Sequence, residues 1–187
     1  MISRLAVLLS LTTLAACGAS STGPALRAKA DSLMDAGQGR VTLYARMQDG
    51  SIMPVAEAGV WQEGTTTSYA VLRDSTGAVL LLVETPTSND REWNNEYRHY
   101  FDAQGRTVFF RRYSGFFDGC DWGLARETLE RSYTDTFETA AELYTLTNQE
   151  GSPQDSTRCE FRYRFPYEVY PTWEAAATAL QLPATVQ

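Results

Sequence analysis

The sequence predicts a mainly β protein: a β-rich α+β fold in which an antiparallel meander is flanked by a short helix at each end. Segments that alternate apolar and polar residues begin at residue 40 and recur to residue 165. Two successive pairs are each joined by an Asp-x-x-Gly turn, which is typical of β-hairpins. Because consecutive hairpins form a meander, we expect a curved sheet or a partly closed barrel within a single domain, residues 24–187.

The first helix is predicted over residues 24–37, "PALRAKADSLMDAG". Its apolar members share one helical face: Leu26, Ala30, Leu33 and Met34. Pro24 suits a first helical turn and Gly37 suits a C-terminal stop. We expect this amphipathic helix to dock on the main body. Its polar face is not strongly basic, which makes a membrane-surface helix the weaker alternative.

Strands are predicted from Arg40 onward, beginning with "RVTLYARM" and a type I′ turn at Asp49-Gly50. The two Asp-x-x-Gly hairpins follow over residues 68–84 and 96–113, each with a type I turn and a glycine bulge. This geometry predicts three cross-strand pairs: Leu72 with Leu80, Tyr100 with Val108, and Glu96 with Arg112.

The second hairpin carries large side chains on both faces. Alternation places Tyr97, His99 and Phe101 on one face and Arg98 and Tyr100 on the other. We expect burial on both sides, with an open aromatic groove as the alternative. For His99, the predicted register gives Phe109 as the cross-strand neighbour.

The remaining elements follow from weaker patterns. Residues 124–146 are predicted as strands by continuity with the meander, and helix is the alternative. "RCEFRYRF", residues 158–165, alternates as a half-buried strand with Cys159 on its inner side. Thr172 is expected to cap a last helix over residues 173–182, with Glu174 in its first turn.

Residues 1–16, "MISRLAVLLSLTTLAA", have the features of a signal peptide. Arg4 precedes an apolar run that would span only about 18 Å as a helix, against a hydrocarbon core of ~30 Å. The run is therefore too short to be a transmembrane helix.

The signal segment ends in "LAAC", which resembles the lipobox of bacterial lipoproteins. The resemblance implies that Cys17 becomes the N-terminus and carries lipid, and that residues 17–23 form a flexible tether to the membrane. Gly18 stands where inner-membrane lipoproteins often have aspartate. This implies a position in the cell envelope, on the outer membrane facing the periplasm in a Gram-negative host. The alternative is an ordinary signal peptide that precedes an incidental cysteine.

With Cys17 assigned to lipid, Cys120 and Cys159 remain. Because exported chains fold in oxidising compartments, we expect these two to form a disulfide. A metal site would need more ligands than this chain offers beside its single histidine, and neither cysteine lies in a C-x-x-C motif.

No catalytic, cofactor-binding or metal-ligating residues are predicted. His99 lies mid-strand, no G-x-S-x-G surrounds a serine, and we expect His99 to be dispensable for function. Carboxylate pairs such as Asp118 with Asp121, or Asp90 with Glu92, could in principle serve a glycosidase. The formal charge of −7 argues against nucleic acid as a partner.

Residues 100–170 contain "YFDAQG", "FFDGC" and "CEFRYRFPYEVY", and this pattern resembles bacterial secreted or lipoprotein domains of uncharacterised function. "YFDAQGR" is also similar to one unit of the YD repeat. The resemblance implies a β-rich envelope domain stapled by a disulfide, without an activity. We therefore expect a membrane-anchored lipoprotein with a non-catalytic binding or structural role, whose partner is an envelope protein or a small apolar ligand. The alternatives are a carrier that holds an apolar ligand in its curved sheet and a carboxylate-dependent hydrolase.

Overall fold

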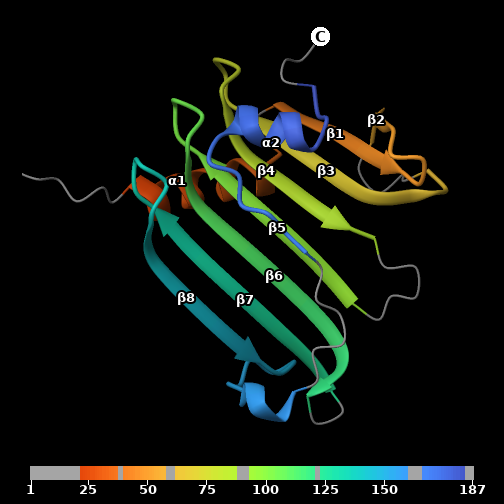
Figure 1. Cartoon of the computed structure of the whole chain (residues 1–187), viewed down its shortest axis with the longest axis vertical. Helices are drawn as coiled ribbons and strands as arrows, with labels where there is room; N and C mark the ends of the chain where they lie inside the picture. The colour runs from red at the N-terminus through yellow and green to blue at the C-terminus, as the bar shows by residue number, and fades with distance from the viewer. Residues whose placement is uncertain are drawn as a thin grey trace, which may run out of the picture.

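The computed structural model describes residues 22–37, 40–57, 62–87, 93–120, 123–159 and 166–183. Its strands are β1 (Arg40–Met47), β2 (Ile52–Val55), β3 (Thr65–Arg73), β4 (Val79–Pro86), β5 (Trp93–Phe101), β6 (Thr107–Cys120), β7 (Gly123–Tyr133) and β8 (Thr139–Thr147). Its helices are α1 (Thr22–Asp35), α2 (Trp173–Ala179) and the 3-10 turn η1 (Ser156–Arg158). All eight strands form one antiparallel sheet in the order β2-β1-β3-β4-β5-β6-β7-β8 (Figure 1). The mainly β prediction is confirmed, and the curved sheet stays open.

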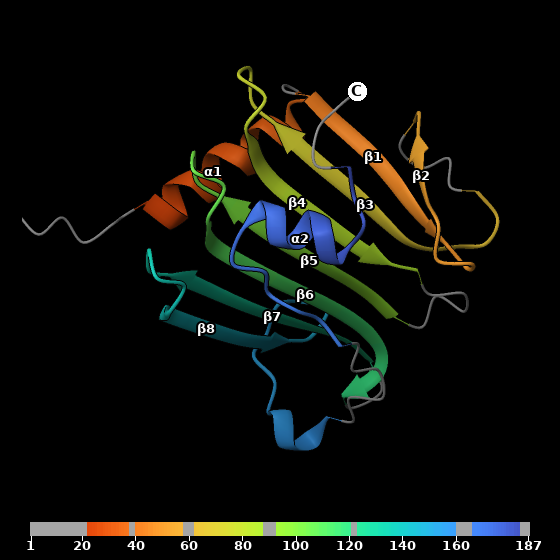
Figure 2. The same cartoon turned by 45° about the horizontal axis from the view of Figure 1, so that its top comes forward.

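The two helices lie on opposite faces of the sheet, which we call the α1 face and the α2 face (Figures 1 and 2). On the α1 face, Ala30 packs with Leu81 and Tyr100 in one buried cluster. On the α2 face, Phe101 packs with Trp173 in another. The β5–β6 hairpin is therefore buried on both sides, as expected from its large side chains.

Helix α1 confirms the amphipathic segment predicted over residues 24–37, but it begins at Thr22, so Thr22 and Gly23 belong to the helix and not to the tether predicted over residues 17–23. Leu26, Leu33 and Met34 are half-buried against the cluster that contains Ala30. The helix ends where the N–H of Gly37 donates to the carbonyl of Met34, at 3.1 Å.

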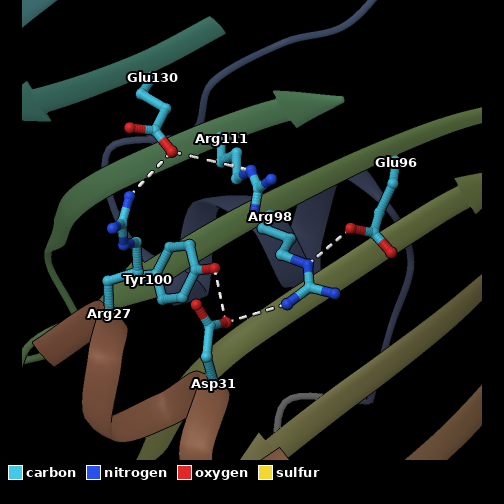
Figure 3. Close-up of polar contacts among 7 residues, drawn as sticks. All are labelled: Arg27, Asp31, Glu96, Arg98, Tyr100, Arg111 and Glu130. Atoms are coloured by element: carbon cyan, nitrogen blue, oxygen red, sulfur yellow. Dashed lines mark hydrogen bonds and ion pairs between the residues drawn. The ribbon is translucent and has the colours of Figure 1, made fainter. Parts of the chain in front are cut away.

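Asp31 fixes the middle of α1 to the sheet (Figure 3). Its Oδ1 accepts hydrogen bonds from Nη1 of Arg98 at 2.9 Å and from the hydroxyl of Tyr100 at 2.8 Å. Arg98 is held in turn by Glu96, whose carboxylate lies 2.6 Å from Nε. Burial and the bond to Asp31 raise the pKa of Tyr100, so this hydroxyl remains a donor at neutral pH.

Arg27 makes a second attachment one turn earlier on the helix. Its Nη1 lies 2.8 Å from Glu130 on β7, and Arg111 on β6 approaches the same carboxylate oxygen at 3.8 Å (Figure 3). The Arg27 guanidinium also lies 5.1 Å from the centre of the Phe109 ring. The polar side of α1 is thus tied to three strands, so the helix and the sheet form one unit.

Asp31→Ala should lower the free energy of unfolding by about 1–2 kcal/mol, because two partly buried donors lose their acceptor. Asp35→Ala is the matched control, since Asp35 is exposed on the same helix. Urea denaturation of both variants measures the difference. Equal stability of the two would show that Asp31 contributes nothing to docking.

The Asp-x-x-Gly turns form as predicted. In the first, the N–H of Gly77 donates to the carbonyl of Asp74 at 3.1 Å, and the N–H of Asp74 donates to Ala78 at 2.9 Å. Gly77 has φ +94°, a region that suits glycine. The Asp74 carboxylate accepts from the N–H of Thr76 at 2.8 Å. Asp102 and Gly105 repeat the arrangement between β5 and β6.

The predicted register of both hairpins is wrong by one residue. The observed pairs are Leu72 with Leu81, Tyr100 with Phe109, and Glu96 with Tyr113. The cause is a further bulge just beyond each turn, because Arg73 pairs with Val79 while Leu72 pairs with Leu81. Because of the bulge, Leu80 has no residue directly opposite it in the first hairpin. Val108 likewise has none in the second hairpin.

The turn after β1 is also corrected. The N–H of Gly50 donates to Met47 at 2.9 Å, and of the residues in this turn only Gly50 has positive φ. A type I′ turn needs positive φ at both central residues, so the turn belongs to the same class as the Asp-x-x-Gly turns.

Residues 124–146 form β7 and β8, which confirms the strand prediction over the helical alternative. Their turn has no glycine. Phe137 takes the glycine position with φ 63° and stacks on Tyr133 with ring centroids 4.7 Å apart.

The predicted cap of the last helix is confirmed, since Oγ1 of Thr172 accepts from the N–H of Ala175 at 3.2 Å. The helix is shorter than expected and ends at Ala179. Gln181 adopts φ 56°, which turns the chain so that Leu180 and Leu182 both reach the core.

In the predicted strand 158–165, Arg158 belongs to η1 and residues 160–165 lie outside the described residues.

The predicted signal peptide and Cys17 lie outside the described residues. Among the helices of the described part of the chain, none is long and apolar enough to cross a membrane.

Candidate functional site

A row of polar and aromatic side chains crosses the α2 face. Its members are lateral neighbours on β1, β3, β4, β5 and β6: Tyr44, Tyr69, Glu84, Tyr97 and Arg112. Residues that are directly opposite in an antiparallel register point to the same face, so these five side chains lie side by side. A carboxylate therefore stands between two tyrosines at the centre of the sheet.

Glu84 is the least compensated charged group of this row. Burial raises the pKa of its carboxyl to about 7, and the charge of Arg46 only partly opposes the shift. Within the described part of the chain, its carboxylate forms no hydrogen bond and no ion pair. A carboxyl group of this kind changes charge near neutral pH, which is a property of functional sites.

Arg46 connects one end of the row to the C-terminal segment. Its Nε donates to the hydroxyl of Tyr69 at 3.0 Å, and its Nη2 donates to the carbonyl of Leu180 at 2.8 Å. The guanidinium lies 5.8 Å from the centre of the Tyr69 ring. Burial raises the pKa of Tyr69, so the hydroxyl that accepts from Arg46 stays neutral.

Tyr167 closes the other end of the row. Its ring stacks on Tyr97 and on Phe110, with ring centroids 5.5 Å apart in both pairs. The Arg112 guanidinium lies 5.0 Å from the centre of the Tyr167 ring and 2.5 Å from the Glu127 carboxylate. Burial, followed by the charge of Glu84, raises the pKa of Tyr97 to about 12.

His99 lies one row from Glu84 and belongs to the core. It is fully buried, and its Nε2 accepts from the N–H of Tyr170 at 3.3 Å. Its cross-strand neighbour is Phe110, which its ring meets edge-on at 4.9 Å, instead of the predicted Phe109. Burial lowers the pKa of His99 to about 3, although a backbone hydrogen bond at Glu168 opposes the shift. The imidazole is therefore neutral at physiological pH and supports the segment that carries Tyr170.

The structure brings Cys120 and Cys159 to disulfide distance, with their Cα atoms 4.2 Å apart. The pair joins the end of β6 to the residue that follows η1. It lies beside Phe116, Ala125 and Leu146 at one end of the sheet.

The carboxylate pairs singled out in the sequence do not form a described site. Asp90, Glu92 and Asp121 lie outside the described residues, as does the side chain of Asp118. In the described ranges, no group of three or more His, Cys, Asp or Glu side chains could hold a metal ion.

The α1 face carries an open apolar groove of about 440 Å³ beside the end of α1. Its walls include Met34, Leu43, Ala70 and Val83. The groove is separated from the Glu84 row by the thickness of the sheet.

Sequence reasoning missed Glu84. The sequence pattern that could have indicated a buried carboxylate is the position of Glu84 at the end of the apolar run "VLLLVE". Alternation along this strand puts Glu84 on the same face as Leu82. The error in register prevented this prediction, because the predicted pairing puts Val83 opposite Tyr69, whereas in the structure Glu84 lies opposite Tyr69.

Comparisons with protein-family models, with curated proteins and with solved structures gave no match. The protein is therefore described by its fold and its candidate site. It is an open eight-stranded antiparallel sheet that carries a buried carboxylate, Glu84, between two tyrosines on one face.

Proposed function

We propose that the chain is a lipid-anchored protein of the cell envelope with a non-catalytic binding role. The observation that carries the proposal is the "LAAC" sequence that ends in Cys17, five residues before α1 begins at Thr22. Because the Asp31 and Arg27 contacts tie α1 to the sheet, a lipid at Cys17 would hold the whole domain close to the membrane. The approach of Cys120 to Cys159 supports an oxidising compartment.

A binding role is favoured over hydrolysis by the surroundings of the titratable groups. His99 is buried and neutral, and Glu84 is flanked by tyrosines. The Glu127 carboxylate is engaged with Arg112, so it does not form with Glu84 the pair that a glycosidase needs.

Cys17→Ser should move the protein from the membrane fraction to the soluble fraction, since the lipid loses its attachment atom. Fractionation followed by immunoblotting measures the distribution. The matched control is the double variant Cys120→Ser/Cys159→Ser, which should stay in the membrane. A Cys17→Ser protein that remains in the membrane like the parent would refute the lipid anchor.

The second candidate function is a carrier of an apolar ligand, and the groove at Ala70 and Val83 favours it. The groove is lined mainly by aliphatic side chains and is of the size of small-molecule sites. A fluorescent fatty acid is the probe: saturable binding that Ala70→Phe abolishes would support the carrier, and unchanged fluorescence would exclude it.

A further inference from the structure

A second groove on the α1 face lies at the end of the sheet that is remote from α1. Strand β6 ends there, whereas α1 packs near the beginning of the same strand (Figures 1 and 2). The groove has a volume of about 370 Å³, which is within the range of small-molecule sites. We call it the Tyr113 groove, and its walls include Asn94, Tyr113, Gly115, Phe117 and Leu124.

Two aromatic side chains of β6 supply the apolar surface of the Tyr113 groove. Alternation along the strand directs Tyr113 to the same face as Phe109, which packs in the cluster under α1. A Cβ atom at Gly115 would lie 3.3 Å from the Tyr113 hydroxyl oxygen, so the end of this ring lies over the glycine. Phe117 retains 58% of its accessible surface. Both side chains can therefore stack on the apolar face of a ligand ring.

Arg126 stands beside the Tyr113 groove and has no partner among the described residues. It lies directly opposite Gly115 and two residues after Leu124, on the same face of β7. Its side chain is half-buried, and its Nε is buried without a hydrogen-bond partner. Within the described ranges, its guanidinium forms no ion pair and no contact with an aromatic ring. Because a buried donor without an acceptor is costly, this arrangement favours an acceptor on a bound molecule.

Two carboxylates that the register places near Arg126 are already engaged. Glu96, on β5, lies 2.6 Å from Nε of Arg98. Glu127 follows Arg126 in the sequence but points to the α2 face, where it pairs with Arg112. The positive charge of Arg126 is thus uncompensated within the described part of the chain, and the carboxylate of a ligand would complement it.

We propose that the Tyr113 groove binds a sugar ring that carries a carboxylate, as in a polymer of hexuronic acid. The apolar face of the sugar stacks on Tyr113 and Phe117, and the guanidinium of Arg126 donates two hydrogen bonds to the carboxylate. The exposed amide of Asn94 offers donors and an acceptor to the hydroxyl groups, which favours a sugar over an aromatic acid. The proposal rests on the binding role proposed above and gives it a ligand class.

Isothermal titration calorimetry with trigalacturonate tests the ligand class on the full protein purified from membranes. The fully methyl-esterified trisaccharide is the matched control, because it keeps the sugar rings and loses the charges. Trigalacturonate should bind with a dissociation constant below about 1 mM, and the ester should bind at least about tenfold more weakly. Benzoate, which has the charge and a flat ring without hydroxyl groups, should bind more weakly than trigalacturonate.

Arg126→Gln should raise the dissociation constant of trigalacturonate at least about tenfold and leave that of the ester unchanged. Arg40→Gln is the matched control, because Arg40 is exposed and bonds to Ser75 at the other end of the sheet. Phe117→Ala should weaken the binding of both trisaccharides, because it removes stacking surface. Circular dichroism of the variants should match the parent, since Arg126 lacks partners in the described chain and Phe117 is exposed.

Nuclear magnetic resonance locates the bound sugar, because the amide signals of Gly115 and Leu124 should shift on titration with trigalacturonate. The proposal is overturned if the parent does not bind trigalacturonate, if acid and ester bind equally, or if benzoate binds more tightly. Equal losses in Arg126→Gln and Arg40→Gln would also overturn it. Each of these outcomes leaves the fractionation of Cys17→Ser unchanged, so failure of this site is distinguishable from failure of the lipid anchor.

Discussion

Glu84→Gln is expected to raise the free energy of unfolding above pH 7 and to leave it nearly unchanged below pH 5. The Glu84 carboxyl has a pKa of about 7 in the folded chain, against 4.5 as its ordinary value. Between these values the unfolded chain releases the proton while the folded chain keeps it. The parent therefore loses stability as pH rises through this window, by about 1–3 kcal/mol. Glutamine stays neutral and should not show this loss.

Urea denaturation at pH 5, 6, 7 and 8 measures the effect. Glu63→Gln is the matched control, because Glu63 is exposed and should follow the parent at every pH. If Glu84→Gln keeps the pH dependence of the parent, then Glu84 titrates normally and the burial argument fails. If Glu84→Gln removes the pH dependence, then the ionised Glu84 carboxylate lowers the stability of the parent at neutral pH. A residue that lowers stability in this way is typical of functional sites.

Replacing Cys120 and Cys159 together by alanine should cost up to about 4 kcal/mol of stability. The two cysteines are 39 residues apart in sequence, and a bond between them removes conformational entropy from the unfolded chain. Reducing agent should lower the denaturation midpoint of the parent toward that of the double variant, which itself should not respond to reductant.

Intact mass after alkylation, with and without prior reduction, reports the state of the two thiols. Protein taken from an oxidising compartment should be alkylated at Cys120 and Cys159 only after reduction. Two free thiols in that protein would contradict the disulfide, even though the structure brings the cysteines together.

Local sequence was sufficient for the elements that local interactions stabilise. The apolar spacing over residues 24–37 predicts α1 because the helical face is set by neighbours three and four residues apart. The turn at Asp74 is predictable for the same reason, since its carboxylate and Gly77 act within five residues. The lipobox at Cys17 is likewise a short contiguous pattern, and it stays a prediction.

Register and burial depended on residues far apart in the chain. No short sequence pattern marks the bulges at Leu80 and Val108. Each bulge shifts the pairing by one residue, so the residues expected to lie opposite each other point to opposite faces of the sheet. Because the predicted register was wrong by one residue, it paired His99 with Phe109 instead of Phe110 and did not place Glu84 beside Tyr69.

The sequence by itself determined most of the elements that the structure describes: an amphipathic helix over residues 24–37 and strands joined by tight turns. Only the tertiary structure decided that Glu84 lies between Tyr69 and Tyr97, that Asp31 holds α1, and that β8 is the last strand of the sheet. The physical reason is that hydrogen bonds within a turn or helix join near neighbours. Burial and lateral pairing are set instead by which distant strands lie side by side.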